Sequence, residues 1–345
     1  MEERKNKLRK ILNDNNLDVI LLFSSRHDSS LSVWAANIIC TSSFHYYYVT
    51  KETSGFIEVS FRANDLRSKT KELVQEFEDE NKITDFLASF LKKFKRVGLA
   101  GNAPFHHFND IKVTNLTNLI SLFLTKKNKY ELNKIQALAK KISFTINKLS
   151  TYIAPDITEL EISAEIKKQV FSFADSFAFP ITVISGNRLL LDTVGEPTNR
   201  KLLKNDVILI DVGAYSSGFY TDLTKMLFVG DHPLEVAYAK LVRAHHKAIS
   251  QLNLNSTLSS INELYIKSIK DEGLSYETLQ SKYLGHSIGF MLHEEPNILQ
   301  EQTKNYKIHE NMVLALEPEI IVDGYHIRVE DMVQIHNGKA KIITS

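Results

Sequence analysis

The sequence predicts an α/β protein of two domains, and three observations lead to this prediction. The chain has 345 residues, more than the size at which a single hydrophobic core keeps growing. Helix-like and strand-like patterns alternate over about the first 125 residues, and two β-hairpin patterns lie between residues 207 and 330. A polar run at 126–129 separates these regions. We therefore expect a small α/β domain at 1–125 and a larger α+β domain at 126–345.

The first domain is expected to contain both helices and strands. Hydrophobic periodicity predicts the helices, and short apolar runs rich in β-branched and aromatic residues predict the strands. The expected helices are Glu2–Asn13 and Ile83–Phe94, and the expected strands are Leu17–Phe23 and Gly55–Val59. Trp34 and the run Tyr46–Tyr48 are more typical of a packed core than of a pocket lining. The second domain is expected to begin with a long helix from Tyr130 to about Ile153.

Composition excludes several classes of partner. The 42 basic and 41 acidic residues nearly cancel, so no overall field attracts nucleic acid or a membrane surface. The single cysteine, Cys40, excludes an intrachain disulfide, and its apolar neighbours favour a buried, unreactive thiol. The apolar run Val19–Phe23 is too short for the core of a secretion signal or for a membrane span. These features predict a cytoplasmic protein.

Two acidic residues are placed symmetrically about the first predicted hairpin. The β-prone runs Val207–Gly213 and Phe219–Thr224 are joined by a Ser/Gly turn, which is a hairpin pattern. Asp211 and Asp222 are equally distant from Ser216-Ser217. A turn centred there would make the two acids cross-strand neighbours.

Glu317 and Glu330 flank a second hairpin in the same way, equally distant from Asp323-Gly324. Asp-Gly is the strongest short hairpin signal, because a type I′ turn needs a positive φ at both central residues. Acids paired in this way have Cβ atoms roughly 5 Å apart. Like charges at that distance destabilise the fold unless a positive charge lies between them. The two acid pairs together therefore predict a bound cation.

His286, in the stretch Gly285–Gly289 between the two hairpins, is a further candidate ligand. Four carboxylates and one imidazole differ from a structural zinc site, which prefers Cys and His. They suit two divalent ions, because four negative charges balance two ions and leave room for a bridging water of lowered pKa. This is the two-metal hydrolytic arrangement, with ions roughly 3.5 to 4 Å apart. Taken singly, each residue also has an ordinary structural explanation; Glu330, for example, could pair with Arg328 on the same face of its strand.

Five motifs that contain these residues resemble those of a known family. They are Asp211-x-Gly213, Asp222 eleven positions later, Gly285-His-x-x-Gly289, Glu317-Pro318 and Arg328-x-Glu330-Asp331. The strings resemble the metallopeptidases of the pita-bread fold, which include methionine aminopeptidase, aminopeptidase P and prolidase, with creatinase as a relative. The resemblance covers roughly residues 128–340 and implies a pita-bread catalytic domain at 126–345 behind a creatinase-like domain at 1–125. It implies that the metal ligands are Asp211, Asp222, His286, Glu317 and Glu330.

The resemblance extends to residues that contact substrate. The stretch His293–Pro296 is similar to the family's His-Glu-x-Pro, which implies that His293 binds substrate and stabilises the transition state. The stretch Ser185–Arg188 is followed by Asp192-Thr193, where the family has Pro-His. Thr193 can donate a hydrogen bond but cannot carry a positive charge, and loss of a transition-state donor costs on the order of a hundredfold to a thousandfold in turnover. The resemblance places Thr193 and Arg328 at the substrate.

The resemblance implies a peptidase with two divalent ions (Mn, Co, Zn or Fe) that cleaves Xaa-Pro dipeptides or amino-terminal Xaa-Pro bonds, and a homodimer. A metal-bound hydroxide would attack the scissile carbonyl, Glu317 would transfer the proton and His293 would stabilise the oxyanion. Two alternatives stay open. One is a catalytically impaired binding protein of the same fold, which Thr193 suggests and metal content would test. The other is a creatinase-like hydrolase of a small carbon–nitrogen substrate, a branch that works without the metal ligands.

Overall fold

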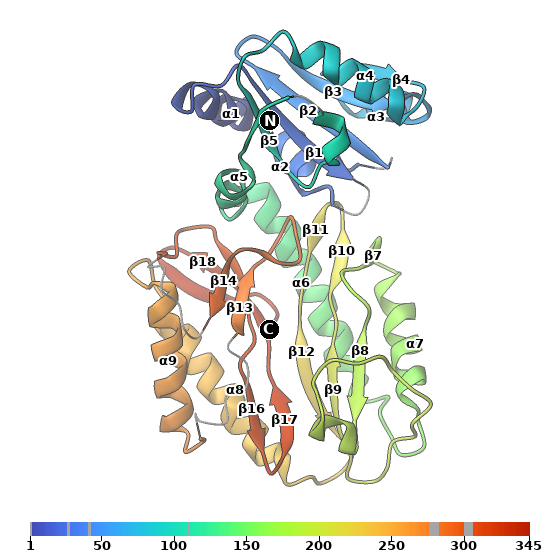
Figure 1. Ribbon diagram of the computed structural model, residues 1–345. Coiled ribbons are helices and arrows are strands. Elements are labelled where there is room, and N and C mark those ends of the chain that lie inside the picture. Colours follow the sequence, from blue (N-terminus) through green and yellow to red (C-terminus); the bar gives the residue numbers. More distant parts are fainter. Residues whose placement is uncertain (1, 26–27, 41–42, 109–110, 276–282, 300–305) are drawn as a thin grey trace. The chain divides into compact units, whose positions relative to one another are not determined.

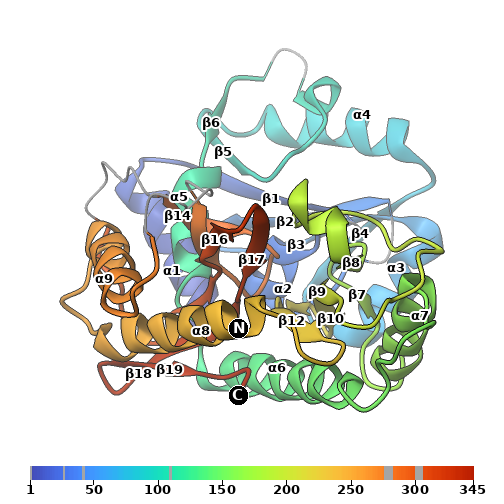
Figure 2. The ribbon, with the colours of Figure 1, turned by 90° about the horizontal axis from the view of Figure 1, so that it is seen from below.

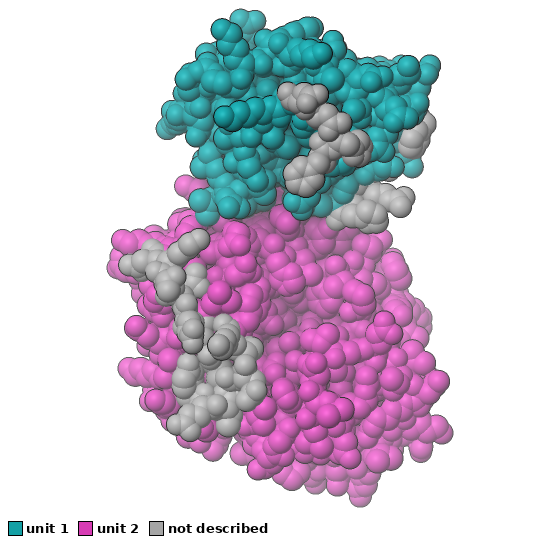
Figure 3. Space-filling view, in the orientation of Figure 1, with its two compact units in different colours: residues 1–124 teal, residues 125–345 magenta. Residues whose placement is uncertain are grey.

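Two compact units make up the chain, Met1–Leu124 and Thr125–Ser345 (Figure 3). The computed structural model describes residues 2–25, 28–40, 43–108, 111–275, 283–299 and 306–345. Its mixture of helices and strands confirms the predicted α/β class. None of the helices in these residues has both the length and the apolar character that a bilayer crossing requires.

The first unit is built on a six-stranded mixed sheet with the strand order β4-β3-β2-β1-β5-β6. Strand β1 pairs antiparallel with β2 and parallel with β5. The buried stripe Ile83, Leu87 and Leu91 of α4 packs into the core formed by β1 and β2. The elements of this unit are α1 (Glu2–Asp14), β1 (Val19–Ser25), α2 (Ser30–Ala36), β2 (Phe44–Thr50), β3 (Ser54–Val59), α3 (Ser60–Lys69), β4 (Leu73–Phe77), α4 (Glu80–Leu91), β5 (Val97–Ala100), η1 (Phe105–Phe108), β6 (Val113–Asn115) and α5 (Thr117–Leu124).

The predicted elements of the first unit are confirmed, with bounds that differ by one to three residues. Helix α4 begins three residues before Ile83, because the Asp79 carboxylate caps it by accepting a hydrogen bond of 3.0 Å from the Lys82 N–H. An aspartate at this position satisfies a donor that the helix leaves free. The run Tyr46–Tyr48 lies buried in β2, and Trp34 and Cys40 are buried as well. These side chains belong to the core, as predicted.

The second unit consists of two helix pairs packed on curved sets of strands (Figure 1; Figure 2). Helices α6 and α7 share one core with β8 and β9, and α8 and α9 share another with β13, β15 and β18. Its elements are α6 (Lys129–Leu149), α7 (Glu159–Val170), β7 (Ser176–Phe177), β8 (Thr182–Ser185), η2 (Gly186–Leu190), β9 (Val207–Asp211), β10 (Ala214–Ser216), β11 (Phe219–Tyr220), β12 (Thr224–Phe228), α8 (Leu234–Gln251), α9 (Leu258–Asp271), β13 (Tyr283–Ser287), β14 (Glu294–Leu299), β15 (Val313–Leu316), β16 (Glu319–Val322), β17 (Tyr325–Arg328), β18 (Asp331–His336) and β19 (Lys339–Ile342).

Strand β9 connects the two cores of the second unit. Val207 and Leu209 face the core that contains α8 and α9, and Ile208 and Ile210 face the core that contains α6 and α7. A strand that is buried on both faces needs a continuous apolar run, which explains why this segment does not alternate with polar residues. Asp211 ends the run, so its carboxylate is held at the end of a rigid central strand.

The first hairpin is present, but its register differs from the predicted one. Strand β9 pairs antiparallel with β12, and Asp211 lies opposite Thr224 instead of Asp222. The turn falls at Ser217 and Gly218, whose φ angles of 53° and 85° are both positive. Glycine adopts such angles without a steric penalty, so the turn centre lies one position beyond the predicted one. Each pairing therefore shifts by two residues, and Asp222 is the diagonal neighbour of Asp211.

The second hairpin has the predicted register. Asp323 and Gly324 have φ angles of 51° and 83°, as a type I′ turn requires. Pairing on both sides fixes the acids between them: Glu319 lies opposite Arg328 in β16 and β17, and Leu316 lies opposite Asp331 in β15 and β18. This register places Glu317 opposite Glu330, which confirms the predicted pairing.

Candidate metal centre

The five residues predicted to bind metal come together in the second unit. Asp211, Asp222 and Glu330 each offer an oxygen, and these three atoms all lie within 4.8 Å of one another. His286, Glu317 and Glu330 form a second group on the same criterion. The His286 Nε2 atom lies 3.6 Å from Asp222 Oδ2 and 3.9 Å from Glu317 Oε1. The two groups share Glu330, so a single carboxylate can serve two neighbouring ion positions.

Strand ends and strand pairing hold these residues. Asp211 ends β9, His286 lies inside β13, and Glu330 immediately precedes β18. The Glu330 N–H donates a hydrogen bond of 3.1 Å to the Thr224 carbonyl, which joins the second hairpin to the first. Ligands on paired strands are positioned more rigidly than ligands on loops.

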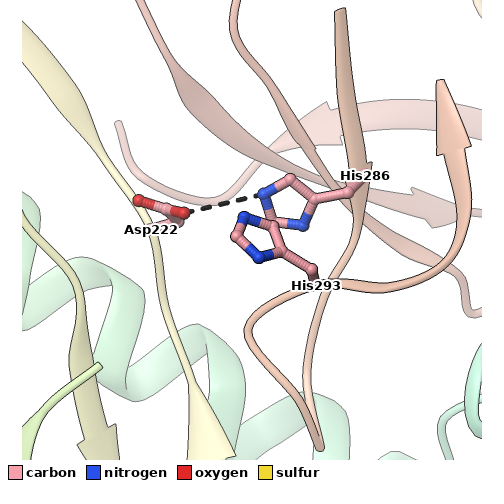
Figure 4. A group of neighbouring side chains, drawn as sticks. All are labelled: Asp222, His286 and His293. Carbon is pink, nitrogen blue, oxygen red and sulfur yellow. Dashed lines mark ion pairs between the residues drawn. The ribbon is translucent and has the colours of Figure 1, made fainter. Parts of the chain in front are cut away.

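His293 lies beside the same cluster, and Figure 4 shows it facing His286 and Asp222. The three residues form another group whose ligand atoms lie within 4.8 Å of one another. The His286 and His293 ring centroids are 4.4 Å apart, with the rings at 72°. His293 is exposed, unlike His286 and Asp222, so it can contact a molecule that binds beside the cluster.

Several ligand atoms of the cluster are buried without a hydrogen-bond partner among the described residues. They are Asp211 Oδ1, Asp222 Oδ1, His286 Nε2 and Glu330 Oε1. A buried polar atom without a partner is costly, and most such atoms in native proteins have one. Here the orphaned atoms belong to one cluster and are all possible metal ligands, so the residues present fit a divalent metal centre.

The pKa values of the acids also fit a divalent metal centre. Burial raises the pKa of Asp211 to about 8, although Arg328 opposes the rise. Burial also raises the pKa of Glu317 to about 7, again against the influence of Arg328, and Asp222 adds to the rise. Burial together with the neighbouring acids raises the pKa of Glu330 well above its ordinary value. The cluster therefore resists carrying its full negative charge, and bound cations would release the protons.

The two histidines differ in protonation. The Nδ1–H of His286 donates a hydrogen bond of 3.0 Å to the Ser287 carbonyl, which leaves the Nε2 lone pair directed at the acids. Burial acts to lower the pKa of His286, but Asp222 and Glu317 outweigh it and the pKa is raised. Burial and the neighbouring His286 lower the pKa of His293. In the form that binds metal, both imidazoles are neutral.

A cavity of about 500 Å³ opens onto the cluster. Its lining combines polar and apolar side chains. The polar ones include Asp211, Asp222, His293, Glu317, Arg328 and Glu330, and the apolar ones include Phe179, Pro180, Ile181, Val194 and Leu292. A cavity of this size, in which apolar side chains lie with convergent polar groups, is typical of a small-molecule site.

Comparison with known proteins decides the family. Residues 133–337 match the family model described as Metallopeptidase family M24, and residues 4–122 match the Creatinase/Prolidase N-terminal domain. This chain belongs to metallopeptidase family M24. The predicted pita-bread fold and the predicted family are thereby confirmed.

Two relatives and one solved structure of similar fold illustrate the match of this M24 chain. The methionine aminopeptidase of Borreliella burgdorferi is 31% identical over 223 residues, which cover 60% of this chain and 85% of that protein. The Xaa-Pro dipeptidase of Pyrococcus furiosus is 24% identical over 271 residues, which cover 75% of this chain and 76% of that protein. The crystal structure of the prolidase from Pyrococcus horikoshii OT3 superposes with a TM-score of 0.88 at 20% identity and covers 99% of this chain and 98% of that one.

Arg328 brings a positive charge to the acidic cluster. Its Nη2 atom donates to Asp211 Oδ2 at 2.5 Å, and its Nη1 atom lies 3.8 Å from Glu317 Oε2. Burial opposes the positive charge, but Asp211 and the other acids outweigh it and hold the pKa of Arg328 above its ordinary value. Arg328 also lines the cavity, where the predicted contact with substrate could form.

Thr193 is buried and lies outside the residues that line the cavity. Its hydroxyl donates a hydrogen bond of 2.8 Å to Glu319 Oε2 and accepts one of 3.4 Å from Arg328. Glu319 also accepts a hydrogen bond of 2.8 Å from His326 Nδ1 when that nitrogen carries the proton. Thr193 therefore holds Glu319 and Arg328 through hydrogen bonds. Its contact with substrate stays a prediction.

Sequence reasoning missed the residues that support the predicted ligands. The Thr224 hydroxyl donates a hydrogen bond of 2.9 Å to Glu330 Oε2. The sequence feature that could have identified Thr224 is its position opposite Asp211 in the observed register. Glu319 stands two positions after Glu317 on the same strand face, which is a signal that period-two alternation provides. The apolar wall of the cavity, such as Phe179 and Leu292, carries no sequence signal that we can identify.

Proposed function

We propose that the protein is a dinuclear metal-dependent peptidase that cleaves Xaa-Pro bonds in short peptides. The observation that carries the proposal is the convergence of four acids and one imidazole with orphaned ligand atoms, where the four acids line a cavity. The ligands would be Asp211, Asp222, His286, Glu317 and Glu330. Carboxylates suit manganese, and a mixed carboxylate and imidazole set also admits cobalt, iron or zinc.

The chain's own residues account for the remaining chemistry. When bound, two divalent ions polarise the scissile carbonyl and make water a nucleophile near neutral pH. Glu317 would accept the proton of the attacking water and deliver it to the leaving nitrogen, which is the role of a general base and acid placed beside the reacting atoms. His293 would donate a hydrogen bond to the developing oxyanion.

The cavity supports a short peptide that contains proline. Its volume of about 500 Å³ and its apolar wall beside the acids would hold a proline ring next to the scissile bond. The named activity of the Xaa-Pro dipeptidase relative supports the same substrate class. The ion pair between Arg328 and Asp211 keeps the guanidinium at the cavity, where it could hold a substrate carboxylate.

Hydrolysis of an Xaa-Pro dipeptide beside an Xaa-Pro tripeptide tests the proposal. The assay uses protein loaded with Mn²⁺ or Co²⁺, a chelator control, and matched Xaa-Ala peptides as the specificity control. Chelator-sensitive cleavage of the proline peptides supports the proposal, and the preferred peptide length distinguishes a dipeptidase from an aminopeptidase. Cleavage of Xaa-Ala alone would overturn the substrate class, and no cleavage with metal fully bound would favour a binding protein.

Two further measurements address the other parts of the proposal. All five candidate ligands lie in the proposed catalytic domain, 126–345, and a homodimer is supported by the resemblance. Static light scattering measures its mass against 39.4 kDa per chain. Two bound ions per chain, measured by elemental analysis, support the dinuclear centre, and the complete ligand set speaks against the creatinase-like alternative.

A further inference from the structure

A buried ion pair lies behind the loop that carries His293. The Lys127 Nζ atom donates to Glu294 Oε2, and neither side chain has exposed surface. Removing two charges from water is expensive, and it succeeds only where additional hydrogen bonds satisfy both groups. Lys127 belongs to no metal or cavity residue set described above, yet Glu294 directly follows His293.

Glu294 binds its own loop as well as Lys127. Its Oε1 atom accepts hydrogen bonds from the Phe290 N–H at 2.6 Å and the Met291 N–H at 3.4 Å. Its Oε2 atom also accepts one of 3.1 Å from the Ser287 hydroxyl. The Glu294 carboxylate thus binds the beginning and the middle of residues 287–294 and itself stands at their end. We call residues 287–294 the histidine loop. His286 precedes this loop, and His293 is its penultimate residue.

Lys127 is fixed on the other side of the pair. Its backbone N–H donates a hydrogen bond of 3.2 Å to the Asn311 carbonyl, and its ammonium lies 5.8 Å from the centroid of the Phe290 ring. Gly289 has a φ of 153°, and a Cβ atom at that position would clash with Lys127 Cε. The histidine loop is therefore packed directly on the lysine side chain.

The histidine loop is also tied to the first hairpin. The Tyr220 N–H donates a hydrogen bond of 2.8 Å to the Gly289 carbonyl, and Asp222 follows two positions later. The loop position therefore sets the place of His293 relative to both His286 and Asp222. Loss of the Lys127 charge would leave Glu294 as an unpaired buried carboxylate, which is strongly disfavoured and would pull the loop toward water.

We propose that Lys127 is a positioning residue that holds His293 in place through its ion pair with Glu294. This inference rests on the proposed function, in which His293 stabilises the oxyanion. Among the described residues, Lys127 belongs neither to the candidate ligand groups nor to the lining of the cavity, so we expect it to affect turnover through the loop.

Steady-state kinetics of Lys127→Met tests the proposal. A displacement of about 1 Å in a catalytic group can cost roughly a hundredfold in rate, so kcat should fall by about that factor while KM and metal content change little. Arg200→Met is the matched control, because Arg200 forms a partly buried ion pair with Asp206 at 2.6 Å outside the cavity. It should lose thermal stability but keep the wild-type kcat. A wild-type kcat for Lys127→Met would overturn the proposal.

A double-mutant cycle separates positioning from general damage. If Lys127 acts through His293, adding Lys127→Met to His293→Ala should cost no further kcat. Losses that multiply would show that Lys127 acts elsewhere and would contradict the proposal. Should Lys127→Met fold poorly, Lys127→Met/Glu294→Gln removes both buried charges and keeps an acceptor for the loop N–H groups. It should regain at least about tenfold in kcat over Lys127→Met, since paired removal is much less harmful than single removal.

A measurement without substrate keeps this inference separate from the proposed function. In protein with ¹⁵N-labelled histidine, the His293 imidazole signal is assigned by its loss in His293→Ala. The signal should shift in Lys127→Met and stay in place in Arg200→Met, whereas the His232 signal should not move in either. If the wild-type protein cleaves no Xaa-Pro peptide, the proposed function fails. The His293 signal still shows whether Lys127 positions His293. An unmoved His293 signal in Lys127→Met would refute the positioning role.

Discussion

The Thr224 hydroxyl donates a hydrogen bond of 2.9 Å to Glu330 Oε2, while the Glu330 N–H donates one of 3.1 Å to the Thr224 carbonyl. These two residues thus bind each other through side chain and backbone. The contact leaves Glu330 Oε1 as the orphaned oxygen of this carboxylate. Thr224 therefore orients one predicted ligand and directs its other oxygen toward the cluster.

Replacement of Thr224 by valine should weaken metal binding without loss of the fold. Valine has nearly the same shape but cannot donate a hydrogen bond, and loss of a group that orients a ligand typically costs 10- to 100-fold in metal affinity. Isothermal titration with Mn²⁺ measures the change. Thr84→Val, at an exposed helix position, is the control. Unchanged affinity for Thr224→Val would mean that the hydroxyl does not orient Glu330.

Replacement of Glu330 by alanine should abolish metal-dependent turnover. Glu330 belongs to both ligand groups, so its loss affects both ion positions. Elemental analysis and peptide hydrolysis provide the measurements, with Glu272→Ala at a surface ion pair as control. Wild-type turnover in Glu330→Ala would rule out the proposed centre.

Replacement of His293 by alanine should lower kcat by roughly a hundredfold to a thousandfold, which is typical for loss of an oxyanion donor. Metal content should stay at the wild-type level if His293 serves substrate. Because His293 also lies among possible ligands with Asp222 and His286, metal content is the decisive measurement. Loss of one ion per chain would reassign His293 as a ligand.

The metal-free protein should become less stable as the pH rises from about 5 to 8. The pKa values of Glu317 and Asp211 are raised by burial to about 7 and about 8, from ordinary values of 4.5 and 3.8. The folded state therefore holds more protons than the unfolded state in this range, and stability is lost as the pH rises through the folded pKa values. Thermal unfolding with chelator should show a falling melting temperature, and Glu317→Gln should reduce the slope.

The matching measurement with saturating Mn²⁺ provides the control for this pH dependence. Bound ions keep the acids ionised in the folded state, so their contribution to the slope should disappear. A fall in melting temperature that is equally steep with and without metal would show that other groups cause it.

Replacement of Thr193 by valine should lower the free energy of unfolding by about 1–3 kcal/mol, the usual cost of a buried group left without its partner. The change removes the hydrogen bond to Glu319 and the acceptor for Arg328. Chemical denaturation measures the loss. A normal stability together with a large rise in KM would instead support direct contact between Thr193 and substrate.

The sequence predicted the second hairpin fully and the first only in part. Asp323-Gly324 permits one turn geometry, so the pairing of Glu317 with Glu330 could be read from spacing alone. In the first hairpin, Ser216, Ser217 and Gly218 offer two turn centres, and only backbone φ angles distinguish them. The acids still converge, because a shift of two positions keeps every side chain on its original face.

The roles of Lys127 and Thr193 could not be predicted, because their partners are distant in the sequence. Lys127 meets Glu294 across 167 positions, and Thr193 meets Glu319 across 126. Neither hydrophobic periodicity nor turn chemistry reports on such pairs. In the sequence, Lys127 belongs to a polar run at the predicted domain boundary. Its side chain is nevertheless fully buried.

The candidate ligands come from two hairpins and from β13, and Thr224 and Glu330, which join the two hairpins, are 106 positions apart. During synthesis, the chain can therefore present only a partial set of acids until the second hairpin has been made and docked. Early capture of an ion at the first hairpin would be weak and reversible. Under the proposed function, metal acquisition would therefore be a late event for each molecule, and a cell short of metal would accumulate folded protein without metal-dependent activity.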